Sequence, residues 1–231
     1  MSNTYKNQYF AIIPAAGKGS RMGSDIPKQY LKILSKTMLE YSLQALVDVP
    51  LIKTIMVVLS RNDRLPFALP SRVKTAVGGN ARHHSVLNGL LALKEAQPLD
   101  WILVHDAARP CLNPLDVIKL INTVGNHPVG GCLGSPVRDT LKYCLKGQIQ
   151  KTVSRENVWQ VFTPQMFRYG ALCSVLHSIA QDASAITDDA SAIEQSGAMP
   201  LMVQGRADNI KVTYPEDLAF VAHILNKQRS P

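Results

Sequence analysis

The stretch YFAIIPAAGKGSRMG, residues 9–23, joins an apolar run to a glycine-rich loop. The run from Tyr9 to Pro14 predicts a buried strand, and the small residues after it predict a tight loop. In α/β proteins, ligands bind where such loops leave the carboxyl ends of strands, and small residues let backbone N–H groups approach a phosphate. The loop also contains the cations Lys18 and Arg21. The stretch therefore predicts a phosphate-binding loop at one edge of a sheet.

The glycines of this loop do not match the two common nucleotide-binding patterns. Gly17 and Gly19 open a G-x-G pair, but Met22 breaks the G-x-G-x-x-G dinucleotide pattern. The spacing of the P-loop, G-x-x-x-x-G-K-[ST], is not present either. Both common patterns therefore fail on spacing, and the tetrapeptide PKQY follows the loop at residues 27–30.

Short apolar runs alternate with helical patterns along most of the chain. This alternation predicts an α/β fold with a Rossmann-like, mainly parallel sheet flanked by helices. A chain of 231 residues, 46% of them apolar, can bury one sizeable core, so we expect a single domain over residues 1–231. We predict strands at 9–14, 55–59, 73–77, 101–105, 200–204 and 209–213. We predict helices at 37–47, 85–96 and 166–180, at 188–195 with Thr187 as N-cap, and from Pro215 onward.

Residues 136–159 interrupt this alternation. Two extended segments, 140–145 and 148–153, meet at Lys146-Gly147, which predicts a protruding β-hairpin arm. An isolated hairpin buries little of itself and is marginally stable. We therefore expect the arm to pack against a partner, most simply a second copy of the chain.

Charge and composition limit the function classes. The formal net charge is +8, but the basic residues are scattered beside glycine, threonine and proline, and only 6% of residues are aromatic. This pattern suits a pocket for phosphates rather than a nucleic-acid groove. The four cysteines include no C-x-x-C pair, which argues against zinc and against disulfides. With neither a signal peptide nor an apolar run long enough to cross a membrane, we expect a cytoplasmic protein that binds no membrane.

Further motifs, taken in order, resemble one enzyme family. The nucleotide loop with PKQY is similar to the signature of the sugar-phosphate nucleotidyltransferases. The other motifs narrow the resemblance to the 2-C-methyl-D-erythritol 4-phosphate cytidylyltransferases, from about Phe10 to Leu225. These motifs are VHDAARP at 104–110, PVRDT at 136–140, TDDAS at 187–191 and GRADNIKV at 205–212. The resemblance implies a fold of the nucleotide-diphospho-sugar transferase type.

The resemblance also implies a reaction, the transfer of CMP from CTP to 2-C-methyl-D-erythritol 4-phosphate. The products are pyrophosphate and 4-diphosphocytidyl-2-C-methyl-D-erythritol, an intermediate of the non-mevalonate route to isoprenoids. The attacking phosphate has a second pKa of about 6, so it is largely ionised at neutral pH and needs no general base. The reaction instead needs positioning and positive charge around an anionic transition state.

Site residues follow from the same resemblance. Arg21 and Lys28 match transition-state stabilisers, whereas Arg155 and Lys211 match residues that hold the acceptor phosphate. Contacts to the acceptor are expected from Asp106, Arg109, Thr140, Arg155, Thr163, Thr187 and Lys211. Contacts to the nucleotide are expected from Pro14, Ala15, Ala16, Gly17, Gly19, Gly79, Asn80, Ser85, Asp106 and Ala107.

Mg²⁺ is the expected cofactor, bound with CTP. Asp106 and Asp208 are its candidate protein ligands, although Asp208 could equally orient Lys211. The family resemblance further implies a homodimer in which each arm reaches the neighbour's active site. Arg155 would then serve the partner's site.

One segment departs from the family pattern. The chain reads GGNARHHS at residues 78–85, with Asn80 where the family usually has an acidic residue. We expect recognition of cytosine by backbone groups of Ala15, Ala16 and Gly79 to survive this change, because fixed polar main-chain groups discriminate between base edges. The adjacent His83 and His84 lack a carboxylate or cysteine at ligand spacing, which argues against a metal site. We expect His105 to be a packed residue at the end of a strand.

Three alternatives stay open from the sequence. The first is a cytidylyltransferase for another polyol phosphate, such as ribitol 5-phosphate, which would share the nucleotide loop. The second is a catalytically silent nucleotide-binding regulator, which should lack Arg21 or Lys28. The third is a nucleic-acid-binding module, which should show clustered basic and aromatic residues.

Overall fold

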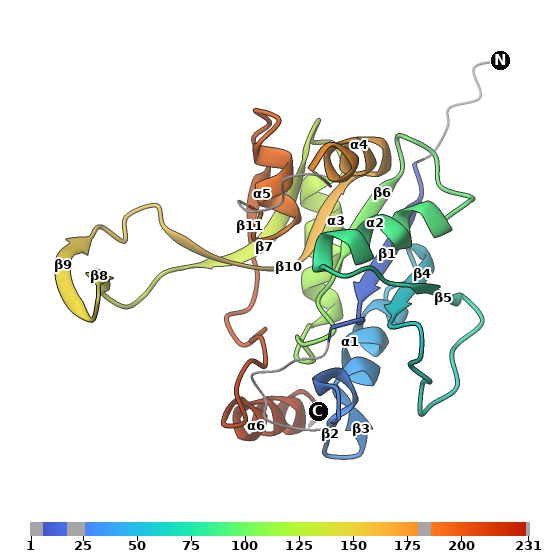
Figure 1. The fold of residues 1–231 in the computed structure, drawn as a ribbon, viewed down its shortest axis with the longest axis horizontal. Helices are drawn as coiled ribbons and strands as arrows, with labels where there is room; N and C mark the ends of the chain where they lie inside the picture. The colour runs from blue at the N-terminus through green and yellow to red at the C-terminus, as the bar shows by residue number, and fades with distance from the viewer. Residues whose placement is uncertain (1–6, 18–25, 180–185, 230–231) are drawn as a thin grey trace.

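The computed structural model describes residues 7–17, 26–179 and 186–229. At its centre lies a seven-stranded sheet in the order β11-β7-β10-β6-β1-β4-β5 (Figure 1). All neighbours in this sheet are parallel except β10, which is antiparallel to both β6 and β7. The strands are β1 (Tyr9–Pro14), β4 (Ile52–Leu59), β5 (Val73–Val77), β6 (Trp101–Val104), β7 (Gly130–Pro136), β10 (Trp159–Arg168) and β11 (Leu201–Gln204).

The strand β1 lies at the middle of the parallel part, between β4 and β6. Its residues Phe10 to Ile13 are fully buried, and Ile12 is in register with both Met56 and Val104. A strand covered on both faces reads as a continuous apolar run. This explains why the first strand was predicted with its exact bounds, and it confirms the α/β fold.

Helices cover both faces of the sheet. The helices α1 (Met38–Val47) and α3 (Pro114–Val124) contribute to one core cluster, whereas α2 (Arg82–Ala92), α4 (Tyr169–Ile179) and α5 (Asp189–Glu194) contribute to the other. A third, smaller cluster joins α6 (Asp217–Arg229) to the short hairpin β2 (Lys32–Ile33) and β3 (Lys36–Thr37). A 3₁₀ turn, η2 (Lys28–Tyr30), precedes that hairpin.

Several predicted elements were wrong in type or in bounds. Residues 166–168 belong to β10, where Phe167 pairs with Ile102, so the helix predicted at 166–180 begins only at Tyr169. Residues 209–213 form no strand, because their hydrogen bonds go to loops: the Val212 N–H donates to the Ala108 carbonyl. The N-cap of α5 is Asp188 rather than Thr187, since its carboxylate accepts from the backbone of Ser191. The structure also contains α3, β7 and β10, which were not predicted.

Two helices begin elsewhere than expected. The helix α2 starts at Arg82, three residues before the predicted start, and α6 starts at Asp217, after a turn at Pro215. Because helix starts depend on local capping, they are the least certain part of a prediction from periodicity.

The hairpin arm is present as predicted. Its strands β8 (Leu141–Leu145) and β9 (Gln148–Val153) pair with each other, and Figure 1 shows them extending away from the body of the molecule. The turn places Lys146 at φ 49° and Gly147 at φ 80°. Positive φ at both central residues is what the type I′ two-residue hairpin turn requires.

No helix in the described part of the chain is long and apolar enough to cross a membrane.

Candidate active site

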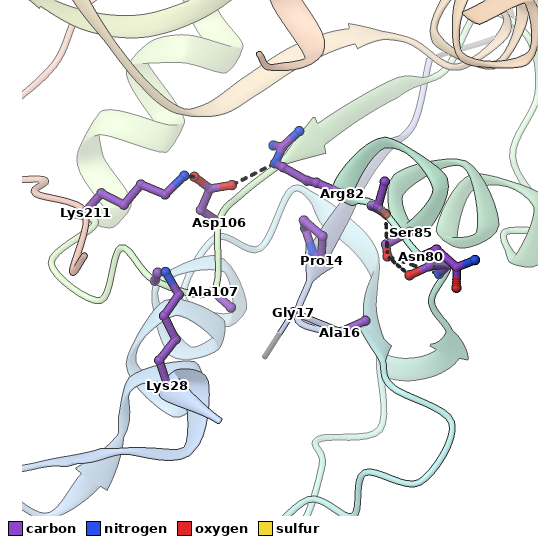
Figure 2. A pocket seen from close by; sticks show the side chains of 13 residues that line it. Pro14, Ala16, Gly17, Lys28, Asn80, Arg82, Ser85, Asp106, Ala107 and Lys211 are labelled. Carbon is purple, nitrogen blue, oxygen red and sulfur yellow. Dashed lines mark hydrogen bonds and ion pairs between the residues drawn. The ribbon is translucent and has the colours of Figure 1, made fainter. Parts of the chain in front are cut away.

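A cavity of about 230 Å³ opens where β1, β5 and β6 end and α2 begins (Figure 2). This is the carboxyl edge of the parallel strands, where α/β sheets bind ligands. Side chains or backbone of thirteen residues line it: Pro14, Ala16, Gly17, Lys28, Gly79, Asn80, Ala81, Arg82, Ser85, Asp106, Ala107, Ala108 and Lys211.

Two small-residue loops meet at this cavity. A Cβ atom on Gly78 would lie 2.5 Å from the Cβ of Ala16, so the two loops can approach only because residue 78 has no side chain. Ala15 is buried behind the lining: its N–H donates to the Val58 carbonyl, and its carbonyl accepts from the Gln29 side chain at 2.8 Å. The second bond fixes the PKQY segment against the loop.

The start of α2 fixes the second loop. The Ser85 hydroxyl accepts a hydrogen bond from the Gly79 N–H at 3.2 Å and donates to the Ala81 carbonyl at 3.1 Å. Asn80 is exposed at the rim. Backbone polar groups are thereby held at fixed positions, which is the arrangement that base recognition through the main chain requires.

Asp106 is the central charge of the site. Three cations surround its carboxylate, Lys211 at 2.7 Å, Arg82 at 3.1 Å and Arg109 at 3.8 Å. Burial by itself would raise the pKa of Asp106, but Arg82, and then Lys211 and Arg109, hold that pKa well below its usual range. The carboxylate is therefore ionised at neutral pH, and the cluster keeps a surplus of positive charge.

Lys28 joins the nucleotide loop to the C-terminal segment. Its ammonium group donates to the Val212 carbonyl at 3.3 Å, next to Lys211. Figure 2 shows Lys28 and Lys211 on the same side of the cavity, opposite Ser85 and Asn80. Positive charge thus gathers at one end and backbone groups at the other.

A second cavity, of about 180 Å³, adjoins the first. Arg82, Asp106 and Lys211 line both cavities and so form a shared wall between them. The other lining residues of the second cavity are Arg109, Val161, Phe162, Thr163, Gln165, Thr187 and Asp188. Five residues predicted to contact the acceptor are therefore brought together here, namely Asp106, Arg109, Thr163, Thr187 and Lys211.

A buried chain of hydrogen bonds holds the backbone and side chains behind this wall in place. His105 is fully buried; its Nε2 lies 3.1 Å from the Arg109 carbonyl and its Nδ1 3.0 Å from the Thr163 hydroxyl. Since a carbonyl can only accept, Nε2 carries the proton, and the Thr163 hydroxyl donates to Nδ1 while accepting from the Asp106 N–H. Burial lowers the pKa of His105 to about 4. His105 is thus a packed residue that follows the end of β6, as expected.

Two predicted residues lie outside both cavities of the same chain. Thr140 and Arg155 are exposed at the base of the arm, where Arg155 donates a hydrogen bond to the Arg138 carbonyl. Neither residue lines the cavities. Gly19 and Arg21 lie outside the described residues.

The interpretation of Asp208 as a residue that orients Lys211 was wrong. Its carboxylate lies 2.5 Å from the Arg206 guanidinium, whereas Lys211 pairs with Asp106. Among the described residues, no group of three or more His, Cys, Asp or Glu side chains is placed to hold a metal ion. Mg²⁺ is commonly held by one or two carboxylates together with substrate phosphates. Of the two predicted ligands, Asp106 lines both cavities and Asp208 lines neither.

Sequence reasoning did not identify Arg82 at the shared wall, or Gln165 and Asp188 at the second cavity. It also missed Asp189, which pairs with Arg82 behind the wall. For Arg82 a signal existed, because it begins an Arg-x-x-Ser spacing with Ser85 at the start of a helix. No comparable signal marked Gln165, which lies in β10 directly before residues 166–168, the part of this strand that was predicted as helix.

Comparison with known proteins agrees with this geometry. Residues 9–227 match the family model for IspD, 2-C-methyl-D-erythritol 4-phosphate cytidylyltransferase. An enzyme of that name from Vibrio atlanticus is 44% identical over 98% of this chain and 99% of its own length. One from Pseudomonas putida is 47% identical over 92% of this chain and 94% of its own.

Solved structures agree as well. The enzyme of the same name from Francisella tularensis superposes with a TM-score of 0.83 at 35% identity, covering 95% of this chain and all of that one. A 4-diphosphocytidyl-2C-methyl-D-erythritol synthase gives a TM-score of 0.82 at 39% identity, covering 96% of this chain and all of its own. By sequence over nearly its whole length, and by fold, this chain belongs to the 2-C-methyl-D-erythritol 4-phosphate cytidylyltransferase family.

Proposed function

We propose that this protein transfers CMP from CTP to 2-C-methyl-D-erythritol 4-phosphate, releasing pyrophosphate and forming 4-diphosphocytidyl-2-C-methyl-D-erythritol for isoprenoid synthesis. The observation that carries the proposal is the pair of adjoining cavities with a common wall of Arg82, Asp106 and Lys211. A nucleotide in the first cavity and a polyol phosphate in the second would meet at that wall. Proximity of two bound reactants is a main source of rate in such a transfer.

The chemistry relies on cations rather than on a general base. The ionised phosphate of the acceptor attacks the α-phosphorus of CTP, and the bond to the β-phosphate oxygen breaks. Lys28, together with Arg21, would stabilise the negative charge on the α-phosphate and on the leaving pyrophosphate. Lys211 would hold the attacking phosphate. His105 takes no part as a base, because both of its ring nitrogens are hydrogen-bonded inside the protein.

Base selection would come from the loop opposite the cations. The groups that would contact the base are mainly backbone groups and one hydroxyl, from Ala16, Gly79 and Ser85. Because a mismatched base edge leaves a buried polar group unpaired, we expect CTP to be strongly preferred over UTP.

Mg²⁺ would be held by the triphosphate and Asp106. When bound, it supplies positive charge that neutralises the phosphates. We expect turnover to vanish in excess EDTA and to return when Mg²⁺ is added.

The proposal further treats residues 1–231 as one nucleotidyltransferase domain that acts as a homodimer, with residues 136–159 as the dimerisation arm. The exposed apolar residues of the arm support this: Leu141 pairs with Val153 and Cys144 with Ile149, and Tyr143 and Ile149 are 53% and 65% exposed. Exposed apolar groups gathered on one segment mark an interaction surface. The cytoplasmic location of the protein stays a prediction.

The test is direct turnover. Purified protein is incubated with CTP, Mg²⁺ and 2-C-methyl-D-erythritol 4-phosphate, and pyrophosphate is measured. Ribitol 5-phosphate replaces the acceptor in a parallel reaction, and UTP replaces CTP in another. Faster turnover with ribitol 5-phosphate would identify a different polyol phosphate as the acceptor. Equal turnover with UTP would contradict the cytidine-specific interpretation.

A further inference from the structure

The guanidinium of Arg82 bridges two carboxylates from separate parts of the fold. Its Nε lies 3.1 Å from Asp106 Oδ1, at the end of β6, and its Nη2 lies 2.8 Å from Asp189 Oδ2, at the start of α5. Arg82 itself is the first residue of α2, so one side chain ties three elements together. Figure 2 shows it reaching across the cavity toward Asp106.

We propose that Arg82 is a positioning residue, which fixes the wall between the nucleotide and acceptor cavities so that the two substrates meet in line. This inference rests on the proposed function. Arg82 would act through the carboxylates of Asp106 and Asp189 rather than by binding a substrate, because its Nε and Nη2 are both engaged by these carboxylates.

On the nucleotide side, Arg82 controls the orientation of Asp106. Arg82 contacts one oxygen of the carboxylate and Lys211 contacts the other, at 2.7 Å. The Lys211 side chain is 40% exposed, so it has little packing of its own. If Arg82 released its oxygen, the carboxylate could rotate, and the ammonium of Lys211 would lose its fixed place beside the reacting phosphates.

On the acceptor side, Arg82 holds the start of α5. The Asp189 side chain is 1% exposed, and its Oδ1 has no hydrogen-bond partner among the described residues. The ion pair with Arg82 is therefore the main interaction that offsets the burial of the Asp189 carboxylate. Separating the pair would leave a buried charge unpaired, which costs free energy. Thr187 and Asp188, directly before Asp189, line the acceptor cavity, and Gln165 donates to Asp188 at 2.7 Å. Moving Asp189 would move both lining residues.

Arginine is required at this position by geometry. A planar guanidinium offers several N–H groups in a fixed fork and can serve two carboxylates at once, whereas the ammonium of lysine is a single point charge on a flexible stem. A lysine at residue 82 would keep the charge but could not hold both carboxylates in the same orientation. Errors of about 1 Å in the placement of reactants cost roughly 10²-fold in rate.

The test compares Arg82→Lys, Asp189→Asn and the double variant. Asp189 lines neither cavity, so Asp189→Asn perturbs the bridge without touching a substrate. Glu95→Gln is the matched control, because it removes a carboxylate from the exposed Lys74–Glu95 ion pair. The readouts are kcat, the KM of each substrate, CTP affinity by direct titration and the thermal midpoint.

We expect each single variant to lower kcat by roughly 10- to 100-fold. CTP affinity should change less than about threefold. The kcat of the double variant should be no lower than that of the less active single variant, because both substitutions break the same bridge. Glu95→Gln should keep wild-type kcat. If Arg82→Lys does not fold, Asp189→Asn alone carries the same test.

Three results would overturn the proposal while leaving the proposed function intact. Wild-type kcat in Asp189→Asn, with or without a lower thermal midpoint, would make the bridge a purely structural tie. Losses that multiply in the double variant would show that the two residues act separately. A loss of CTP affinity confined to Arg82→Lys would show direct nucleotide binding. A wild-type protein without turnover would contradict the proposed function itself, and the inference with it.

Discussion

The paired cavities and the hairpin arm differ in what surrounds their charged side chains. At the cavities, Asp106 is buried and held by Arg82 and Lys211 within one subunit. On the arm, Arg155 is exposed and hydrogen-bonded only to a neighbouring stretch of the same arm among the described residues. At the cavity wall, Arg82 and Lys211 both pair with Asp106, whereas on the arm Tyr143, Ile149 and Arg155 are exposed. Under the proposed homodimer, the wall between the cavities is held within one subunit, and the arm of a second subunit would contribute to the acceptor side.

The largest effect should come from a cation of the cavity. We expect Lys28→Ala to lower turnover by about 10²-fold or more, because it removes an electrostatic stabiliser of the transition state. Acceptor KM should change little. The exposed Lys32→Ala is the control, since Lys32 lines neither cavity. Steady-state kinetics with both substrates measures these effects. Near-normal turnover with weaker acceptor binding would mean that Lys28, rather than Lys211, holds the acceptor phosphate.

The next effect concerns the stability of the buried chain of hydrogen bonds behind the cavity wall. The pKa of His105 is lowered to about 4, against an ordinary value of 6.5, so the unfolded chain binds a proton between these values that the folded chain does not. Stability from this group is present above pH 6.5 and is lost as the pH falls toward 4. The loss should be about 2 kcal/mol between pH 7 and pH 5.

Urea unfolding at a series of pH values measures this dependence. The pKa of His83 is also lowered, chiefly by burial, and acts in the same direction. His105→Gln therefore serves as the comparison, because it removes only the contribution of His105. An equal pH slope in this variant and in the wild type would show that His105 does not cause the effect.

The arm can be tested by mixing subunits. Lys28→Ala and Arg155→Ala chains, each nearly inactive alone, are combined under conditions that exchange dimers. If Arg155 serves the partner's site, each mixed dimer has one site with both residues intact. With random pairing about half the dimers are mixed, so roughly a quarter of wild-type activity should return. No recovery, despite exchange shown by mass-tagged chains, would place Arg155 in its own subunit's site.

The smallest effect should come from the exposed apolar residues of the arm. Ile149→Ser should raise the dissociation constant of the dimer roughly tenfold or more, as expected for losing one buried isoleucine. Gln150→Ser, which changes a polar neighbour on the same strand, should leave it unchanged. Sedimentation at several protein concentrations measures both. Equal dissociation constants would remove these residues from the interface.

The sequence by itself determined the central strand, the class of fold, the hairpin and the family. Residues 9–14 form an uninterrupted apolar run because both faces of β1 are covered, and Lys146-Gly147 supplies the turn that a hairpin needs. These are local signals, readable over a few residues. The identity of most lining residues followed from motifs whose spacing is also local.

Only the tertiary structure decided how these motifs combine. The apolar residues Met166 and Phe167 fit a helix or a strand equally well, and pairing with β6 and β7 made them part of β10. Residues 209–213 read as a strand, but bonds to loops far along the chain hold them beside the site. The bridge from Arg82 to Asp106 and Asp189 joins residues 24 and 107 positions apart. Periodicity carries no information about such contacts, because they depend on how the elements pack and not on the order in which they occur.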